Sequence, residues 1–298
     1  MFSNMKDKLW LLFILITVLT WGVWGAFSDL QMDRDGIPET VVYILWALTM
    51  IPCAIVALCI NKGKFLHDGK SALLGCTVGL LGAGGQLVLF KALAIGPAYI
   101  IFPFISMSPV VVITLAAIFL KEKANRWQIA GIVVALIAIL LLSIQSGGDD
   151  SPVSGWLWIV LAVLVLFAWG IQGFFMKFAN NSMDAESIFV WMAISGLVLI
   201  PVAWFMDSAP MTAAQYFAQD GVACASLTCF GIQLLNAIGA LTLVYAYRYG
   251  KAVIVSPMEG LSPMVTVLLS LIILSVIPTP LQIAGICCAA FAMYALSK

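Results

Sequence analysis

The pentapeptide Gln-Ile-Ala-Gly-Ile stands at residues 128–132 and again, 154 residues later, at 282–286. The same offset relates Gly96 to Gly250, and earlier in each half the offset is 148. Further matches at these two offsets join Ser108-Pro109 to Ser262-Pro263 and Trp21-Gly22 to Trp169-Gly170. Matches held at constant offsets predict an internal duplication. We place the two units at residues 1–148 and 149–298, and assign the six-residue difference to an insertion around residues 207–219.

The composition requires a membrane protein. Of the 298 residues, 63% are apolar and only 9% are charged, against about 45–50% and a quarter in soluble domains. Fourteen basic residues balance fourteen acidic ones, so the chain has no net charge with which to bind nucleic acid. The seven cysteines lie in apolar stretches without the paired spacing of a metal site, and we expect no metal and no cofactor.

The predicted fold is an all-α membrane protein with ten transmembrane helices. A bilayer core about 30 Å thick needs about 20 helical residues. Two long apolar stretches exceed that length, and we expect them to turn at Gly96-Pro97 and at Gly250. The predicted spans are 9–31, 38–60, 70–94, 97–120, 126–145, 155–177, 185–206, 221–247, 251–275 and 279–297.

The basic residues give the orientation. Cytoplasmic loops are rich in Lys and Arg. With ten spans and both termini in the cytoplasm, all of the 14 basic residues except Arg34 and Lys91 fall on the cytoplasmic side. We therefore expect a multi-pass protein of the inner (plasma) membrane with cytoplasmic N- and C-termini.

Five helices per unit make the two units an inverted repeat. Because five is odd, the second unit enters the membrane from the opposite side. Such repeats are typical of secondary transporters, with the substrate site near the bilayer midplane between the halves.

Four stretches resemble the EamA family of the drug/metabolite transporter superfamily. They are WGVWGAF at 21–27, GPAYIIFPFISMSPV at 96–110, FLKEK at 119–123 and the QIAGI stretch. The resemblance covers nearly the whole chain and implies a ten-helix inner-membrane permease, often an exporter of amino acids or other small metabolites. One departure is Glu122, whose counterpart is Val276, and we read Glu122 as a helix-end residue without substrate contacts.

Four prolines occupy matching places in the two units. A proline inside a helix frees a backbone carbonyl, and corresponding interruptions in the two halves indicate a transporter's binding site. We predict helix breaks or gating points at these residues, with simple packing kinks as the alternative. The residues are Pro103, Pro109, Pro257 and Pro263.

Glu259 is the single most informative residue. It lies about eight residues inside the predicted ninth helix, about 12 Å from its end. A carboxylate at that depth costs several kcal/mol unless it is protonated, paired or hydrated. We predict that Glu259 binds a substrate amine or couples transport to a proton, and the alternative is a structural ion pair with Lys91, Lys177 or Arg248. The symmetric position is Ile105, so the site is asymmetric.

Mid-helix tryptophans and buried amides complete the candidate substrate site. Trp normally collects at the membrane surfaces, yet three lie mid-helix near glycines. They form cavity walls, or else they pack the first helix against the sixth. The amides contact the substrate or hold helices together. The candidates are Trp21, Trp24, Gln86, Trp169, Gln172, Gln233 and Asn236.

The leading prediction is a secondary transporter that moves a small organic metabolite or drug by alternating access. Because the sequence lacks clusters of His, Asp and Ser, we do not expect an enzyme. The expected direction is export, with proton coupling through Glu259. The expected partners are the small-molecule substrate and the lipid bilayer, without nucleic acid, and the sequence leaves monomer and homodimer open. The alternatives are a flippase for lipids or lipid precursors and an integral-membrane enzyme.

Overall fold

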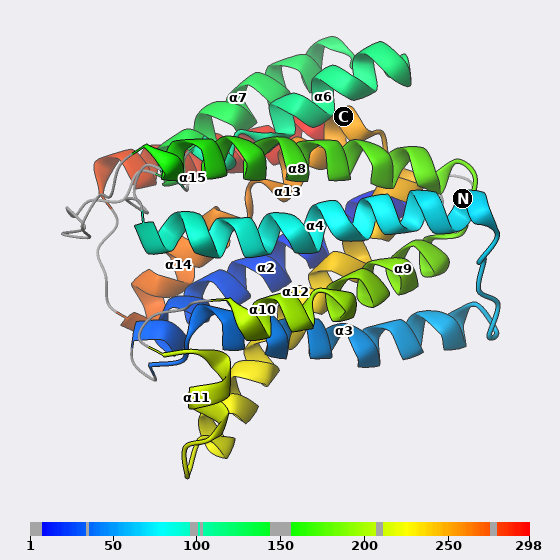
Figure 1. Cartoon of the computed structure of the whole chain (residues 1–298). Helices are drawn as coiled ribbons and strands as arrows, with labels where there is room; N and C mark the ends of the chain where they lie inside the picture. Colours follow the sequence, from blue (N-terminus) through cyan, green and yellow to red (C-terminus); the bar gives the residue numbers. More distant parts are fainter. Residues whose placement is uncertain are drawn as a thin grey trace.

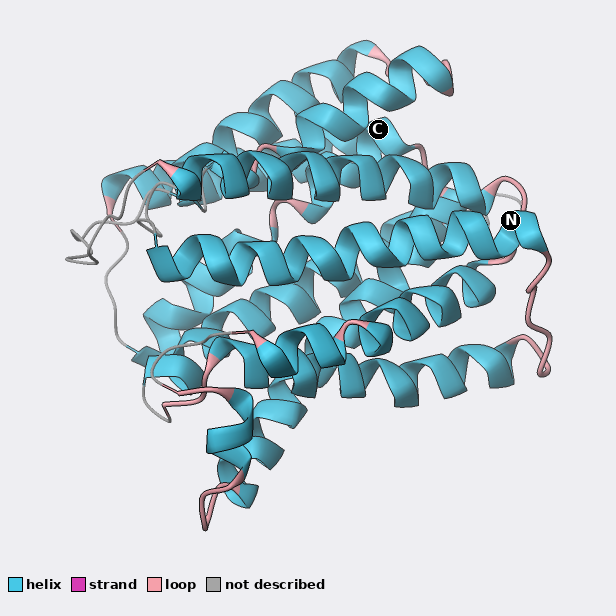
Figure 2. Ribbon diagram, viewed as in Figure 1, coloured by secondary structure: helices cyan, strands magenta, loops and turns pink. Residues whose placement is uncertain are grey.

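The computed structural model describes residues 8–33, 36–95, 101, 104–143, 156–206, 211–274 and 279–298. Within these ranges every regular element is a helix (Figure 2). The predicted turn at Gly96-Pro97 and the candidate Pro103 lie outside the described residues.

Among the residues that the structure describes, seven segments are long and apolar enough to cross a membrane, and three shorter apolar helices accompany them. The chain is therefore an all-α, multi-pass membrane protein. The helices are α2 (Leu9–Asp33), α3 (Glu39–Ile60), α4 (Gly69–Ile95), α6 (Ser108–Phe119), α7 (Arg126–Ser143), α8 (Leu157–Asn180), α9 (Ala185–Val198), α10 (Ile200–Phe205), α11 (Ala213–Phe217), α12 (Ala223–Tyr249), α13 (Ala252–Glu259), α14 (Ser262–Leu274) and α15 (Pro280–Leu296).

The described helix boundaries follow the sequence prediction in most places and differ in three. The predicted seventh span, 185–206, is two helices, α9 and α10, which meet at Leu199. The turn at Gly250 is confirmed, because α12 ends at Tyr249 and α13 begins at Ala252. The predicted ninth span is two helices, since α13 ends at Glu259 and α14 starts at Ser262. The segment assigned to an insertion contains the short helix α11, which a Thr212–Gln215 capping box starts.

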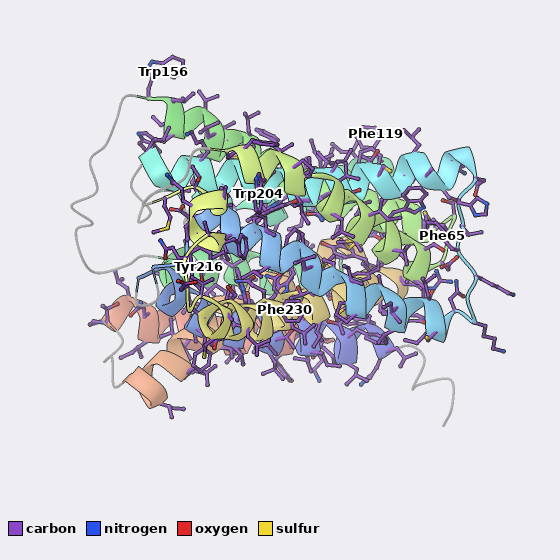
Figure 3. All side chains as sticks on the ribbon, turned by 60° about the horizontal axis from the view of Figure 1, so that its bottom comes forward. Phe65, Phe119, Trp156, Trp204, Tyr216 and Phe230 are labelled. Carbon is purple, nitrogen blue, oxygen red and sulfur yellow. The ribbon has the colours of Figure 1, made fainter. Side chains whose placement is uncertain are left out.

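One end of the bundle carries most of the positive charge. Figure 1 places the α3–α4, α6–α7 and α8–α9 links at the same end. The α12–α13 link lies there too, because Lys251 Nζ donates a hydrogen bond to Lys123 O at 2.8 Å. We call this the basic end; its cationic residues include Lys62, Lys64, Lys70, Lys121, Lys123, Arg126, Arg248 and Lys251. Trp156 stands at the opposite end from Phe65 (Figure 3).

Close helix crossings in the two halves use equivalent residues. Gly22 of α2 packs on α14, where a Cβ would lie 3.0 Å from Ser262 O. Gly170 of α8 packs on α6, where a Cβ would lie 3.1 Å from Ser108 O. These four residues are partners at the offsets of 148 and 154. The contact of α2 with α14 therefore recurs as the contact of α8 with α6.

A second pair of crossings joins the helices that carry the repeated pentapeptide. A Cβ at Gly131 of α7 would meet Leu296 Cγ of α15 at 2.9 Å. A Cβ at Gly285 of α15 would meet Leu142 Cγ of α7, also at 2.9 Å. Small residues let membrane helices approach this closely, so the glycine of each pentapeptide is explained by the helix that packs on it.

We predict that Gly22→Ala destabilises the protein. The added Cβ overlaps the Val265 side chain and crowds the α14 backbone, and overpacking of this kind costs about 1–3 kcal/mol. Thermal unfolding in detergent micelles measures the loss. The control is Gly231→Ala in α12, which has open space around it and gains helix propensity. Equal melting temperatures for the two variants would contradict the close crossing.

Candidate functional site

The break between α13 and α14 positions Glu259. Glu259 is the last residue of α13, and Gly260 caps the helix. Pro263 lies in the first turn of α14, just as Pro109 lies in the first turn of α6. Both prolines therefore start a helix, where the missing N–H costs nothing. Pro257 lies inside α13.

One oxygen of the Glu259 carboxylate is held and the other is not. Tyr247 OH and Ser256 Oγ each donate to Oε1 at 3.4 Å. Oε2 is buried and has no hydrogen-bond partner among the described residues. Buried polar atoms are nearly always paired, so this oxygen can accept a proton or an external cation.

The cations proposed as structural partners of Glu259 are engaged elsewhere or are exposed. Lys177 Nζ donates to Tyr247 O at 2.9 Å and to Gly250 O at 2.6 Å. Arg248 Nη1 donates to Met183 O at 3.1 Å, and Lys91 is exposed. Across the described ranges, none of these three residues forms an ion pair with Glu259.

Tyr247 and Ser256 were not predicted, although the sequence contains a signal for them. At the offset of 154, Tyr247, Ser256 and Glu259 correspond to Leu93, Phe102 and Ile105. Three polar residues in the second half thus replace three apolar residues in the first. Ser256 also precedes Glu259 by three residues, which places both on one helix face.

The second group lies where α2 and α3 meet α12. Trp24 Nε1 donates to Gln233 Oε1 at 3.0 Å, and Trp46 Nε1 donates to Asn236 Oδ1 at 2.8 Å. Trp21 Nε1 donates to Asn236 O at 3.1 Å. The indoles fix the carbonyl side of each amide, so each amide NH2 faces away from its indole. Trp46 was not predicted. Its counterpart at the offset of 148 is Ile194, so Trp46 is not among the residues that recur in both halves.

The third group lies between α8 and α4. Trp169 packs on Gly85, and its Nε1 donates to Gly82 O at 3.4 Å. The Gln172 amide lies against Gly82. The predicted packing of the first helix against the sixth is replaced by two other contacts, since Trp21 packs on Gly239 of α12 and Trp169 on α4. Gln86 is partly buried in α4.

The candidate residues therefore form separate groups. Tyr247 lies eleven residues beyond Asn236 on α12, which is about 16 Å along the helix axis. We call Trp21, Trp24, Trp46, Gln233 and Asn236 the amide group. The amide group and the Glu259 group lie at two different levels along α12, and the Glu259 group is nearer to the basic end.

Glu122, which follows α6 in the first half, contacts the start of α13 in the second half at the basic end. Its Oε2 accepts a hydrogen bond from Val253 N at 3.1 Å, at the start of α13. Burial raises the pKa of Glu122, and the hydrogen bond from Val253 and the charge of Lys177 partly offset that rise. The contact satisfies an N–H that a helix start leaves unpaired.

We predict different effects for two Glu122 variants. Because the folded protein raises the pKa of this acid, ionised Glu122 costs stability as the pH rises through that pKa. Glu122→Gln has no charge and keeps an oxygen for Val253 N–H, so its stability at pH 7 should be unchanged or slightly higher. Glu122→Ala removes the acceptor and should cost about 1 kcal/mol. Thermal unfolding in micelles checks both; a Gln variant as unstable as the Ala variant would contradict this account.

Comparison with known proteins gives matches along almost the whole chain. The profile of the EamA-like transporter family matches residues 8–144 and again residues 156–298. A probable terminal-alkyne amino-acid exporter of Streptantibioticus cattleyicolor is 26% identical over 276 residues, which cover 91% of this chain and 88% of that protein. An uncharacterized transporter of Helicobacter pylori is 22% identical, covering 83% and 80%.

Two further matches concern the repeat and the fold. An uncharacterized protein of Methanocaldococcus jannaschii is 30% identical over 132 residues, which cover 94% of that protein but 44% of this chain. A solved crystal structure has a TM-score of 0.71 at 13% identity, covering 95% of this chain and 97% of the other. At that identity the likeness concerns the fold alone.

Proposed function

This chain belongs to the EamA-like transporter family, and on that premise we propose that it is a ten-helix secondary transporter that exports a small organic metabolite by alternating access. That it is a multi-pass membrane transporter follows from the family and the apolar helices. The helix count, direction, cargo and coupling belong to the proposal.

The paired helix crossings are the observation that carries the proposal. Contacts of α2 with α14 and of α8 with α6 use residues related by the two sequence offsets, as do the contacts of Trp21 with Gly239 and of Trp169 with Gly85. Contacts that recur with the halves exchanged are expected of a pseudo-two-fold arrangement. The family profile matches the chain twice, and the Methanocaldococcus relative has about the length of one half.

The proposal of ten crossings adds the shorter apolar helices Ser108–Phe119, Arg126–Leu142 and Pro280–Leu296 to the seven long spans found among the described residues. Five crossings per half invert the second half relative to the first. The basic end then faces the cytoplasm, because cytoplasmic loops carry Lys and Arg. The protein thus lies in the inner membrane with both termini in the cytoplasm.

Cysteine labelling in intact cells tests this topology. On a background without the seven native cysteines, Lys64→Cys marks the α3–α4 link and Asp220→Cys marks the loop between α11 and α12. A membrane-impermeant maleimide should label Asp220→Cys but should reach Lys64→Cys only after lysis. Labelling of both positions from outside would rule out the inverted repeat.

The amide group is the proposed cargo station. The indole of Trp46 turns the NH2 group of Asn236 away from it, where it can donate to a carboxylate, while Trp24 holds the neighbouring Gln233 in place. Trp169 and Gln172 of α8, which pack on α4, are the second set of side chains that we propose along the path. An amino-acid cargo fits these donors, and one relative is named an amino-acid exporter.

Glu259 is the proposed coupling group. Its Oε2 is buried and has no hydrogen-bond partner within the part of the chain that the structure describes, while Tyr247 and Ser256 donate to Oε1. A carboxylate in that position is expensive until a proton or a substrate ammonium neutralises it. Glu259 can be neutralised by a proton or by the ammonium of a cargo molecule that has moved along α12 from the amide residues, but not by both. This competition would exchange an inward proton for outward cargo. The break between α13 and α14 next to Glu259 provides the point at which the helix can bend.

Flux in proteoliposomes with an imposed pH gradient tests the coupling. We expect Glu259→Gln to abolish the stimulation by the gradient, because the amide cannot exchange a proton. The matched control is Glu122→Gln, the same change in an acid whose carboxylate caps α13, and it should retain gradient-driven flux. A panel of amino acids and other small metabolites identifies the cargo.

Two outcomes separate the parts of the proposal. Wild-type flux that ignores the gradient, with Glu259→Gln unchanged, would remove proton coupling but leave a facilitated transporter. No flux of any solute, with lipid movement between leaflets instead, would replace the permease with a flippase.

A further inference from the structure

A hollow of about 570 Å³ lies at the basic end, between the ends of α2, α12 and α15 and the start of α13. Its size is within the range of about 300–1,000 Å³ that is typical of small-ligand sites. Four cationic side chains line it: Lys8, Arg248, Lys251 and Lys298. Its described lining contains no Asp or Glu side chain. Like charges that surround one hollow repel each other, so this hollow favours an anion.

Main-chain carbonyls, and not carboxylates, hold two of these cations in place. Arg248 Nη1 donates to Met183 O at 3.1 Å, and Lys251 Nζ donates to Lys123 O at 2.8 Å. A carbonyl orients a cation without neutralising its charge. The Glu122 carboxylate, which is not part of the lining, interacts electrostatically with Lys251. Lys8, Arg248 and Lys298 therefore supply most of the positive charge that a ligand would meet.

The other two cations stand at the ends of outward-facing apolar stripes. On α2, Lys8 is followed at helical spacing by Leu12, Leu15 and Leu19, all three exposed. On α15, Lys298 is preceded at the same spacing by the exposed Tyr294 and Phe291, and its Nζ lies 4.9 Å from the Tyr294 ring centroid. Stripes of this kind face acyl chains in a bilayer, with the cations at the level of the headgroups.

Two aromatic residues of the lining suit the same level of the membrane. Trp10 and Tyr249 line the hollow, and the exposed Tyr249 ring stacks on Phe13 with centroids 5.9 Å apart. Trp and Tyr are enriched at the membrane–water boundary because one part of each ring system is apolar and the other is polar.

We propose that this hollow binds the phosphate of an anionic glycerophospholipid, whose acyl chains lie along the exposed faces of α2 and α15. Basic pockets between membrane helices are suited to anionic headgroups. A soluble phosphate ester shares the headgroup chemistry, but it would not contact the two apolar stripes that run from Lys8 and Lys298 along α2 and α15. The site lies at the perimeter of the bundle, apart from the Glu259 and amide groups, and does not depend on the transport proposal.

Native mass spectrometry of the purified full-length protein tests the proposal. Phosphatidylglycerol and phosphatidylcholine are added in turn, and the ratio of their apparent affinities is measured. The test variant is Lys8→Gln/Lys298→Gln, and both side chains are exposed. The control is Lys64→Gln/Lys70→Gln, which removes two exposed lysines of the same end but outside the hollow.

We expect the wild type and the control to prefer phosphatidylglycerol. The test variant should lose about 25-fold of that preference, because each lysine beside an anionic lipid contributes about fivefold. If the double variant lacks a native thermal transition, Lys298→Gln alone should lose about fivefold.

Three results would overturn the proposal. The first is an equal preference in the test and control variants, which would make the effect one of overall charge. The second is no preference for phosphatidylglycerol in the wild type. The third is that glycerol phosphate or inorganic phosphate competes with phosphatidylglycerol for binding as well as phosphatidylglycerol itself does at the same concentration. That result would assign the hollow to a soluble anion.

Discussion

The fold depends on how closely two helices can approach inside a membrane. Water is absent there, so packing between helix surfaces replaces the hydrophobic effect, and only small side chains let two backbones come near each other. Gly22 and Gly170 meet this need at equivalent crossings, and Gly85 and Gly239 each receive a tryptophan ring. Because these glycines sit at related positions, each close crossing in one half implies one in the other. The path that we propose for the cargo runs between these crossings.

Much of the fold could be predicted from the sequence because its determinants are local. The apolar stretch assigned to 279–297 is α15, Pro280–Leu296, and the turn at Gly250 is where α12 ends. The break after Glu259 could not be placed, because proline and glycine mark several possible positions and packing against Pro109 and Ile139 selects one. The partners of the candidate residues were also missed. Tyr247 reaches Glu259 across the Gly250 turn, and nothing local in the sequence encodes that contact.

The polar residues are much less symmetric than the glycines. Glu259 and its two partners correspond to apolar residues in the first half, and Glu122 corresponds to Val276. In the alternating-access mechanism that we propose, symmetry in the packing residues would let the scaffold adopt two related arrangements. Asymmetry in the polar residues then lets one end of the path differ chemically from the other. A transporter with a fixed direction and a single coupling group needs both properties.

The charges around the α12–α13 link separate into structural and functional ones by their partners. A helix break in a membrane exposes carbonyls at one end and N–H groups at the other, and both must be satisfied within the protein. Lys177 satisfies the carbonyls that end α12, and Glu122 satisfies an N–H that starts α13. Each charge has the sign that the helix dipole favours at its position. Glu259 lies between the carboxyl end of α13 and the start of α14 and satisfies no backbone group at either helix end in the way that Lys177 and Glu122 do. One of its oxygens has no partner among the described residues. Burying this carboxylate is unfavourable, and it satisfies no helix end in exchange. We therefore assign Glu259 to function.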